Sequence, residues 1–296
     1  MSSWSGVGTA LVTPFTASGA VDERAFTALV ERQVRGGVQF VVPCGTTGET
    51  PTLSRSEREA VVRITVDVCA GRIPVLAGVG GYDTAEVADL AHATEKLGVQ
   101  GLLSVTPYYN KPTQEGLYQH YRAIAARTSL PIIVYNVPGR TGCNVDPGTL
   151  VRLAAIPNIV GVKEASGNMQ QMCEVCRAVP DDFSVLCGDD ALALPLMAVG
   201  GRGVISVASN IVPERMVAMI AAALSGDCAA ARGAHQSLLP LMLVNFIESN
   251  PIPVKAALAM LGLCEPVYRL PMVPPSEASA AKIRQTLVDA GLQLNA

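Results

Sequence analysis

The 296-residue sequence has few of the side chains that bind transition metals. It contains only three histidines, at positions 92, 120 and 235, and its eight cysteines are scattered along the chain. Cys173 and Cys176 form a single CxxC pair, and no second CxxC is present to complete a zinc site. We therefore predict reduced thiols, no metal site and no redox role for this pair.

Charged residues are also few, and they form no basic cluster. Lys, Arg, Asp and Glu make up 16% of the chain and give a formal net charge of −3, which argues against a nucleic-acid partner. No apolar stretch is long enough to span a membrane: the run at residues 216–224 is short, and Arg202, Asn210 and Asp227 interrupt its surroundings. Residues 1–6 lack the positive region of a secretory signal. With 49% hydrophobic residues, the composition predicts a compact cytoplasmic protein without a membrane partner.

What the sequence does contain is one alternation, repeated along most of its length. A short apolar, β-branched run is followed by a loop and then by a segment with helical spacing. Capping signals begin helices at Ser54 and Asp83, each with a glutamate three positions later. Eight strands are predicted, at residues 8–12, 40–43, 74–78, 101–105, 131–135, 159–163, 183–187 and 203–207. Eight strand–helix units predict an α/β fold, the (β/α)8 TIM barrel, with an open doubly wound sheet as the alternative.

The last part of the chain has a different character. It is rich in Ala and Leu, has helical spacing and is interrupted by Pro240, Pro251 and Pro253. We therefore predict a catalytic barrel over residues 1–225 and a helical C-terminal extension over residues 226–296.

Lys163 is the most informative single residue, because it ends an apolar run that reads as a buried strand. Lysine is rarely fully buried, and burial disfavours the charged form of an amine. A neutral amine attacks carbonyl carbon and forms a Schiff base. From this segment alone, the alternative is an exposed lysine at a sheet edge. In a barrel, however, the carboxyl ends of the strands meet at one mouth, where catalytic residues gather.

Three other predicted strand ends bring polar groups to that mouth. Residues 45–49 read Gly-Thr-Thr-Gly-Glu, a sharply turning backbone with two hydroxyls that suits a small carboxylate, or else an ordinary turn. Residues 106–112 and 135–142 contribute tyrosines, and Arg140 contributes a guanidinium. Each tyrosine alone could simply hydrogen-bond locally, but the joint arrangement favours a site.

The glycines at residues 78–81 lack the spacing of a dinucleotide fingerprint.

Together these segments resemble the superfamily of dihydrodipicolinate synthases and N-acetylneuraminate lyases, which are pyruvate-dependent class I aldolases. The resemblance covers nearly the whole chain and is strongest toward the dihydrodipicolinate synthases. It includes the motifs GTTGE, VTPYYNKPTQEGLYQH, YNVPGRTG, GVKEASG, CGDD, GVISV and NPIPVK. The resemblance implies a TIM barrel that needs no cofactor and forms a covalent Schiff base with pyruvate on Lys163.

The resemblance also implies roles for individual residues. Lys163 would condense with the ketone of pyruvate, while Thr46 and Thr47 would hold the pyruvate carboxylate. Tyr135 would act as general acid and base, with Thr47 and Tyr109 relaying protons toward solvent. The resulting enamine would attack the aldehyde of L-aspartate 4-semialdehyde and give 4-hydroxy-tetrahydrodipicolinate, a step of lysine and diaminopimelate biosynthesis.

The second substrate and the assembly are implied in the same way. Arg140 would bind the carboxylate of the semialdehyde through two parallel hydrogen bonds, which favours a synthase over a lyase. The backbone of Ile205 would form the far wall of the pocket. Tyr109 would enter the site of an adjacent subunit, which implies a homotetramer built as a dimer of dimers. The alternatives are an N-acetylneuraminate lyase, a 4-hydroxy-2-oxoglutarate aldolase or, more remotely, a non-catalytic barrel.

The likeness weakens where lysine-inhibited members of the superfamily bind that effector. Glu86 and Tyr108 suit a bound amino acid, but bulkier and more positive side chains replace the usual small polar partners. The matching positions are Thr50, Pro51, Arg55, Arg58, Tyr82, Glu86 and Tyr108. We predict weak or absent inhibition by L-lysine. The alternative is that the arginines point into solvent and leave the pocket usable.

Overall fold

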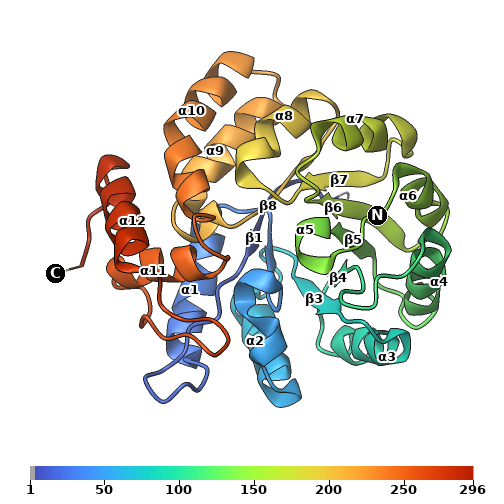
Figure 1. The fold of residues 1–296 in the computed structure, drawn as a ribbon, viewed down its shortest axis with the longest axis horizontal. Helices are drawn as coiled ribbons and strands as arrows, with labels where there is room; N and C mark the ends of the chain where they lie inside the picture. Colours follow the sequence, from blue (N-terminus) through green and yellow to red (C-terminus); the bar gives the residue numbers. More distant parts are fainter. Residues whose placement is uncertain (1–3, 296) are drawn as a thin grey trace.

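In the computed structural model, eight parallel strands form the centre of the molecule and helices surround them (Figure 1). The structure describes residues 4–295. Along the sheet the strands follow the order β2-β1-β8-β7-β6-β5-β4-β3. The sheet closes because Val41 of β2 pairs in parallel with Val75, just before β3. The strands are β1 (Gly6–Ala10), β2 (Phe40–Val42), β3 (Leu76–Gly80), β4 (Gly101–Val105), β5 (Ile132–Asn136), β6 (Ile159–Glu164), β7 (Ser184–Cys187) and β8 (Gly203–Ser206). The predicted (β/α)8 barrel is confirmed, and the open-sheet alternative is wrong.

The helices of the outer layer begin at local capping signals. The side chains of Ser54 and Glu57 each accept a hydrogen bond from the other's backbone amide, so the predicted capping box of α2 is present. Asp83 caps α3 by accepting from the amides of Ala85 and Glu86. The helices that follow the strands are α1 (Glu23–Arg35), α2 (Arg55–Cys69), α3 (Thr84–Glu95), α4 (Gln114–Ala125), α6 (Pro147–Ala154), α7 (Met169–Ala178), α8 (Ala193–Ala198) and α9 (Pro213–Leu224).

Short helices shape several loops at the carboxyl ends of the strands. They are η1 (Thr46–Gly48) and η2 (Thr50–Thr52) after β2, α5 (Pro138–Thr141) after β5, η3 (Asp190–Leu192) after β7 and η4 (Ala208–Asn210) after β8. The chain then continues as α10 (Cys228–Val244), α11 (Ile252–Met260) and α12 (Glu277–Asp289). In Figure 1 these three helices, orange to red, lie on one side of the barrel, with α10 beside α8 and α9. The division into a barrel over residues 1–225 and an extension over residues 226–296 stays a prediction.

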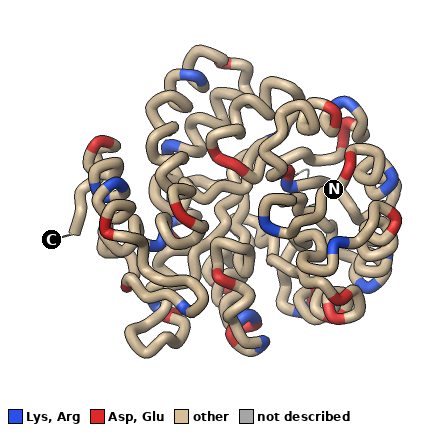
Figure 2. The backbone as a smooth tube through the Cα atoms, viewed as in Figure 1, with Lys and Arg blue, Asp and Glu red and all other residues tan. Residues whose placement is uncertain are grey.

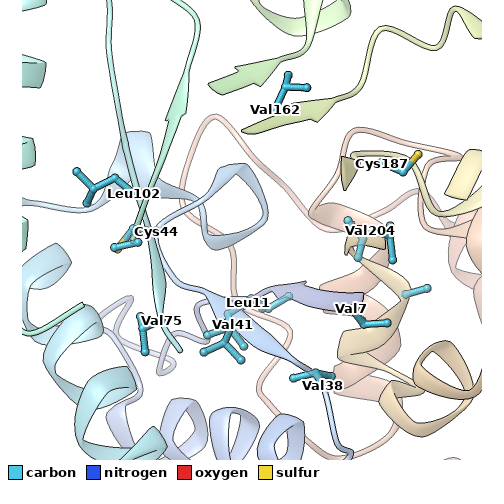
Figure 3. Close-up of a cluster of buried hydrophobic side chains, with 14 of the residues drawn as sticks. Val7, Leu11, Val38, Val41, Cys44, Val75, Leu102, Val162, Cys187 and Val204 are labelled. Atoms are coloured by element: carbon cyan, nitrogen blue, oxygen red, sulfur yellow. The ribbon is translucent and has the colours of Figure 1, made fainter. Parts of the chain in front are cut away.

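Alternation along the strands separates two cores. One lies inside the barrel and contains Phe40, Leu76, Leu103, Ile133, Tyr135, Leu186 and Ile205. The other lies between strands and helices, and Figure 3 shows part of it, including Leu102 and Val162. Because successive side chains of a strand point to opposite faces, Val162 on the outer side places Lys163 on the barrel interior. The same rule places Tyr135 of β5 inside, and Tyr135 is the register partner of Lys163.

Two strands end two residues away from their predicted ends, and the other six end within one residue of theirs. β1 stops at Ala10 rather than at residue 12, because the side chain of Asn210 accepts from the amide of Val12 at 3.2 Å and donates to the carbonyl of Ala10 at 2.8 Å. β3 runs on to Gly80 rather than stopping at residue 78. A Cβ on Gly78 would lie 1.9 Å from the carbonyl oxygen of Cys44, so glycine here permits close strand packing rather than a turn.

Most charged residues lie on the outer helices and loops, and few lie near the strands (Figure 2). Over residues 4–295, no helix combines the length and the apolar character needed to cross a bilayer. Nowhere in that same range do three or more His, Cys, Asp or Glu side chains come together as a metal-binding group. All eight cysteines are unpaired thiols, as the sequence predicts.

Candidate active site

A cavity of about 330 Å³ opens at the carboxyl ends of the strands, a size usual for small-molecule sites. Its wall combines the loop after β2, the ends of β3, β4 and β5, and segments on either side of α11. The residues that line it include Thr46, Glu49, Tyr108, Tyr135, Arg140, Asn250 and Met272. The structure therefore brings Thr46, Tyr135 and Arg140 of the predicted set to one hollow.

Lys163 lies directly beside Tyr135 within the barrel. Its side chain is buried, with only 5% of the residue exposed, and Nζ lies 4.3 Å from the centroid of the Tyr135 ring. Gly188, after β7, makes room for the lysine, because a Cβ there would lie 3.1 Å from Lys163 Cε and 2.5 Å from Ala165 Cβ. Within residues 4–295, no carboxylate forms an ion pair with Lys163. The amine is thus buried without a fixed counter-ion beside a phenol.

The loop that carries Thr46 and Thr47 is held from the C-terminal side of the chain. Thr47 is buried in η1, and its Oγ1 accepts a hydrogen bond from Asn250 Nδ2 at 3.0 Å. Asn250 was not predicted as a site residue. Its only sequence signal is its place in the NPIPVK segment, and no periodicity connects that segment with the Thr46–Thr47 loop 200 residues earlier.

A second buried lysine supports the same loop. Lys255 of α11 donates to Glu49 Oε1 and to the carbonyl of Val267 at 3.1 Å, and its Nζ lies 4.1 Å from the centroid of the Phe15 ring. Desolvation lowers the pKa of Lys255, while the adjacent Glu49 carboxylate raises it. Unlike Lys163, Lys255 has a carboxylate partner, so its contacts indicate a structural role.

Arg140 and Ile205 lie at opposite depths of the site. Arg140 is exposed on α5 at the mouth, and its Nη2 donates to the backbone carbonyl of Asn250 at 3.3 Å. Ile205 is fully buried in β8, within the interior core, and does not line the cavity with its side chain. A contact between the Ile205 backbone and a substrate stays a prediction.

Tyr109 is not brought to the cavity of its own chain. It is 90% exposed and has a φ of 74°, a left-handed conformation that is costly for a residue other than glycine. The neighbouring Tyr108 turns inward, lines the cavity and packs edge-to-face on Tyr82, with ring centroids 5.5 Å apart. The structure therefore separates Tyr109 from Tyr135, Lys163 and Thr47.

The predicted effector positions are only partly gathered. Thr50, Pro51, Arg58 and Tyr108 line the cavity. Arg55 points to solvent and pairs with Glu59, and Glu86 is exposed in the first turn of α3.

A buried strand-end lysine beside a tyrosine in a (β/α)8 barrel defines the class of Schiff-base-forming lyases and aldolases. The chain belongs to the dihydrodipicolinate synthetase family, whose sequence profile matches residues 3–290.

Individual members of the family are similar over their full lengths. The 4-hydroxy-tetrahydrodipicolinate synthase of Koribacter versatilis is 53% identical over 292 residues, which cover 98% of this chain and 97% of that protein. The crystal structure of dihydrodipicolinate synthase from Thermotoga maritima superposes with a TM-score of 0.97 at 47% identity, covering 99% of this chain and 100% of that one. The chloride-inhibited dihydrodipicolinate synthase of Acinetobacter baumannii, complexed with pyruvate, gives 0.96 at 44% identity and covers 98% and 99%.

Proposed function

We propose that this chain is a 4-hydroxy-tetrahydrodipicolinate synthase that condenses pyruvate with L-aspartate 4-semialdehyde through a Schiff base on Lys163, in lysine and diaminopimelate biosynthesis. The observation that carries the proposal is the buried Lys163 amine, 4.3 Å from the Tyr135 ring and without a carboxylate partner within residues 4–295. Family membership and the pyruvate complex of the Acinetobacter baumannii relative support it. The unpaired cysteines suit the reducing cytoplasm, which we propose as the location.

The chemistry follows from an amine and a phenol held together. Lys163 Nζ attacks C2 of pyruvate, and the carbonyl oxygen leaves as water after accepting protons from the adjacent Tyr135 phenol. The iminium draws electrons from C3, which loses a proton and becomes an enamine. C3 then forms a bond to the aldehyde carbon of the semialdehyde, whose oxygen takes a proton. The amino group of the same substrate displaces Lys163 from C2 and closes the ring.

The two carboxylates are bound at different places in this proposal. Thr46 and Thr47 hold the pyruvate carboxylate through hydroxyl and backbone amide, deep in the loop after β2. Arg140 holds the semialdehyde carboxylate at the mouth, where its guanidinium lines the cavity and remains exposed to an incoming anion. This arrangement orders the substrates, since the pyruvate adduct forms beneath the second binding position.

The proposal is tested by trapping the adduct. Incubation with pyruvate and borohydride, followed by peptide mass spectrometry, is expected to modify Lys163 and to leave the buried Lys255 unmodified as an internal control. Lys163→Ala is expected to give no adduct, and Arg140→Ala to form the adduct while losing semialdehyde turnover. Modification at another lysine, or turnover of N-acetylmannosamine in place of the semialdehyde, would contradict the proposal.

We further propose that the enzyme works as a homotetramer, a dimer of dimers, in which Tyr109 reaches into the site of a neighbouring subunit. Its 90% exposure and left-handed backbone support this role, because an isolated surface tyrosine gains nothing from such strain.

For regulation we propose weak or absent inhibition by L-lysine. Arg58 adds positive charge to the cavity wall, which disfavours the ammonium of an amino acid, and Glu86 is exposed rather than enclosed. A titration of activity with millimolar L-lysine tests this, and half-loss of activity in that range would refute it.

A further inference from the structure

We propose that Asn250 is a positioning residue that turns the hydroxyl hydrogen of Thr47 toward the pyruvate carboxylate, an inference that rests on the proposed function. Asn250 lines the cavity, is only 4% exposed, and donates from Nδ2 to Thr47 Oγ1 at 3.0 Å. It comes from the C-terminal part of the chain, 203 positions away from Thr47.

The direction of this hydrogen bond decides what Thr47 does. An amide NH2 group can only donate, so Thr47 Oγ1 must be the acceptor. A hydroxyl has one hydrogen, and no other residue within 4–295 accepts it from Thr47. That hydrogen is therefore left for the carboxylate of the proposed pyruvate adduct. Without Asn250, the Thr47 hydroxyl could rotate and point its hydrogen away from the pyruvate carboxylate.

The bond to Thr47 is also the only hydrogen bond that the Asn250 side chain makes in the described part of the chain. Its Oδ1 is buried and accepts no hydrogen bond from residues 4–295. An unused buried acceptor costs stability, so packing alone does not favour an asparagine here. Asn245 carries the same unused acceptor, so what distinguishes Asn250 is its place in the cavity wall and its hydrogen bond to Thr47.

The backbone on both sides of the Thr47–Asn250 bond is fixed by other contacts. Two residues after Thr47, Glu49 forms its buried ion pair with Lys255, five residues after Asn250. Arg140 donates to the backbone carbonyl of Asn250 at 3.3 Å. Asn250 thus contacts both Thr47, proposed to bind the pyruvate carboxylate, and Arg140, proposed to bind the second carboxylate. The nearby Lys255–Glu49 ion pair holds these segments in place.

Asn250→Ala tests the inference against a matched control. Asn245→Ala removes another buried asparagine of the same region, whose Nδ2 donates only to the carbonyl of Leu241 and whose Oδ1 also lacks a partner. Both variants lose a buried amide, so both are expected to unfold at a lower temperature. Only Asn250→Ala is expected to raise the pyruvate concentration for half-maximal adduct formation at Lys163, by about tenfold, the worth of one hydrogen bond.

Two further variants separate positioning from packing. Asn250→Asp keeps the shape but can only accept from Thr47 and adds a negative charge, so it is expected to weaken pyruvate capture at least as much as Asn250→Ala. In a Thr47→Val background, Asn250→Ala is expected to change pyruvate capture less than twofold, because the two residues act through one bond.

Specific outcomes would overturn the inference. If Asn250→Asp captured pyruvate better than Asn250→Ala, or if Asn250→Ala matched Asn245→Ala, Asn250 would be a packing residue. These results would leave the proposed function intact, since the wild-type chain would still form the Lys163 adduct. Absence of that adduct in the wild type would instead refute the proposed function itself.

Discussion

At the scale of single residues, the two buried lysines show how environment assigns a role. Lys163 and Lys255 are both buried, and each lies over an aromatic ring, Tyr135 or Phe15. Lys255 also has a carboxylate, Glu49, and a backbone carbonyl as acceptors. Lys163 has neither within residues 4–295, and the carboxylate of the next residue, Glu164, is taken up by the Asn136 side chain and the Ser166 amide. One lysine is therefore fixed by a carboxylate and a carbonyl, and the other has no such partner and is left to react.

The Lys255–Glu49 pair predicts a large effect on stability. Lys255→Met leaves the Glu49 carboxylate buried without its counter-ion, because the two side chains are 0% and 1% exposed. We expect a loss of about 3–5 kcal/mol in the free energy of unfolding. The double variant Lys255→Met/Glu49→Gln removes both charges and should lose less. Urea unfolding at one fixed protein concentration measures both, and a single variant as stable as the wild type would contradict the prediction.

At the scale of elements, the glycines of β3 show that glycine can either end a strand or allow a neighbouring backbone to approach it closely. The predicted strand ends at Gly78, whereas β3 continues through Gly80. A Cβ on Gly78 would lie 1.9 Å from a backbone oxygen, that of Cys44, and a Cβ on Gly80 would lie 2.5 Å from Val105 Cγ1. The sequence shows a glycine but not the neighbouring strand that approaches it, so strand existence was predictable here and strand length was not.

This close approach predicts opposite effects for two glycine substitutions. Gly78→Ala forces backbone apart at the β2–β3 seam and should cost at least about 3 kcal/mol, at the upper end of overpacking. Gly148→Ala, in the first turn of α6, meets no atom within 4 Å and should be neutral or stabilise by up to about 1 kcal/mol. Thermal unfolding of the two variants decides, and equal melting temperatures would show that the seam can relax.

The start of α2 is linked to the C-terminal segment through a carboxylate with a perturbed pKa. The Arg269 guanidinium, helped by the Ser54 amide and hydroxyl, lowers the pKa of Glu57 to about 2. A lowered pKa in the folded state means that folding favours the ionised form. The stability that results is complete above the unfolded-state value, about 4.3, and is lost as the pH falls toward 2.

Glu57→Gln should therefore flatten the acid limb of the stability profile. Between pH 5 and pH 2 the wild type is expected to lose more stability than the variant, by about 1 kcal/mol, since water screens this partly exposed pair. Glu59→Gln, on the same helix, removes only a surface pair with Arg55 and should leave the profile unchanged. The measurement is the urea midpoint at several pH values, and parallel profiles for wild type and Glu57→Gln would refute the assignment.

At the scale of the whole molecule, closure and long-range contacts were beyond the sequence pattern. Local periodicity predicts the eight strand–helix units and places Lys163 at the end of a strand. These two predictions are enough to locate a site at the mouth of a barrel. Closure depends on the pairing of Val41 with Val75, and the support of Thr47 depends on Asn250, contacts that no local pattern encodes. The cavity wall joins segments on either side of α11 to the loop after β2, so no local pattern predicts it.

The subunit arrangement can be tested by mixing inactive chains. If Tyr109 serves a neighbouring site, a Lys163→Ala subunit can lend its intact Tyr109 to a Tyr109→Ala subunit, which keeps its own Lys163. Random pairing should then restore about one quarter of wild-type activity, because half of the pairs are hybrid and each has one complete site.

The control mixture pairs Lys163→Ala with Tyr135→Phe. These two residues lie together in one chain, with Nζ 4.3 Å from the ring, so no pairing of subunits can rebuild a complete site. We expect activity to return in the first mixture and to stay absent in the second, after unfolding and refolding the chains together. If neither mixture recovers while refolded wild type does, Tyr109 does not act across a subunit boundary, and its exposed, strained conformation needs another cause.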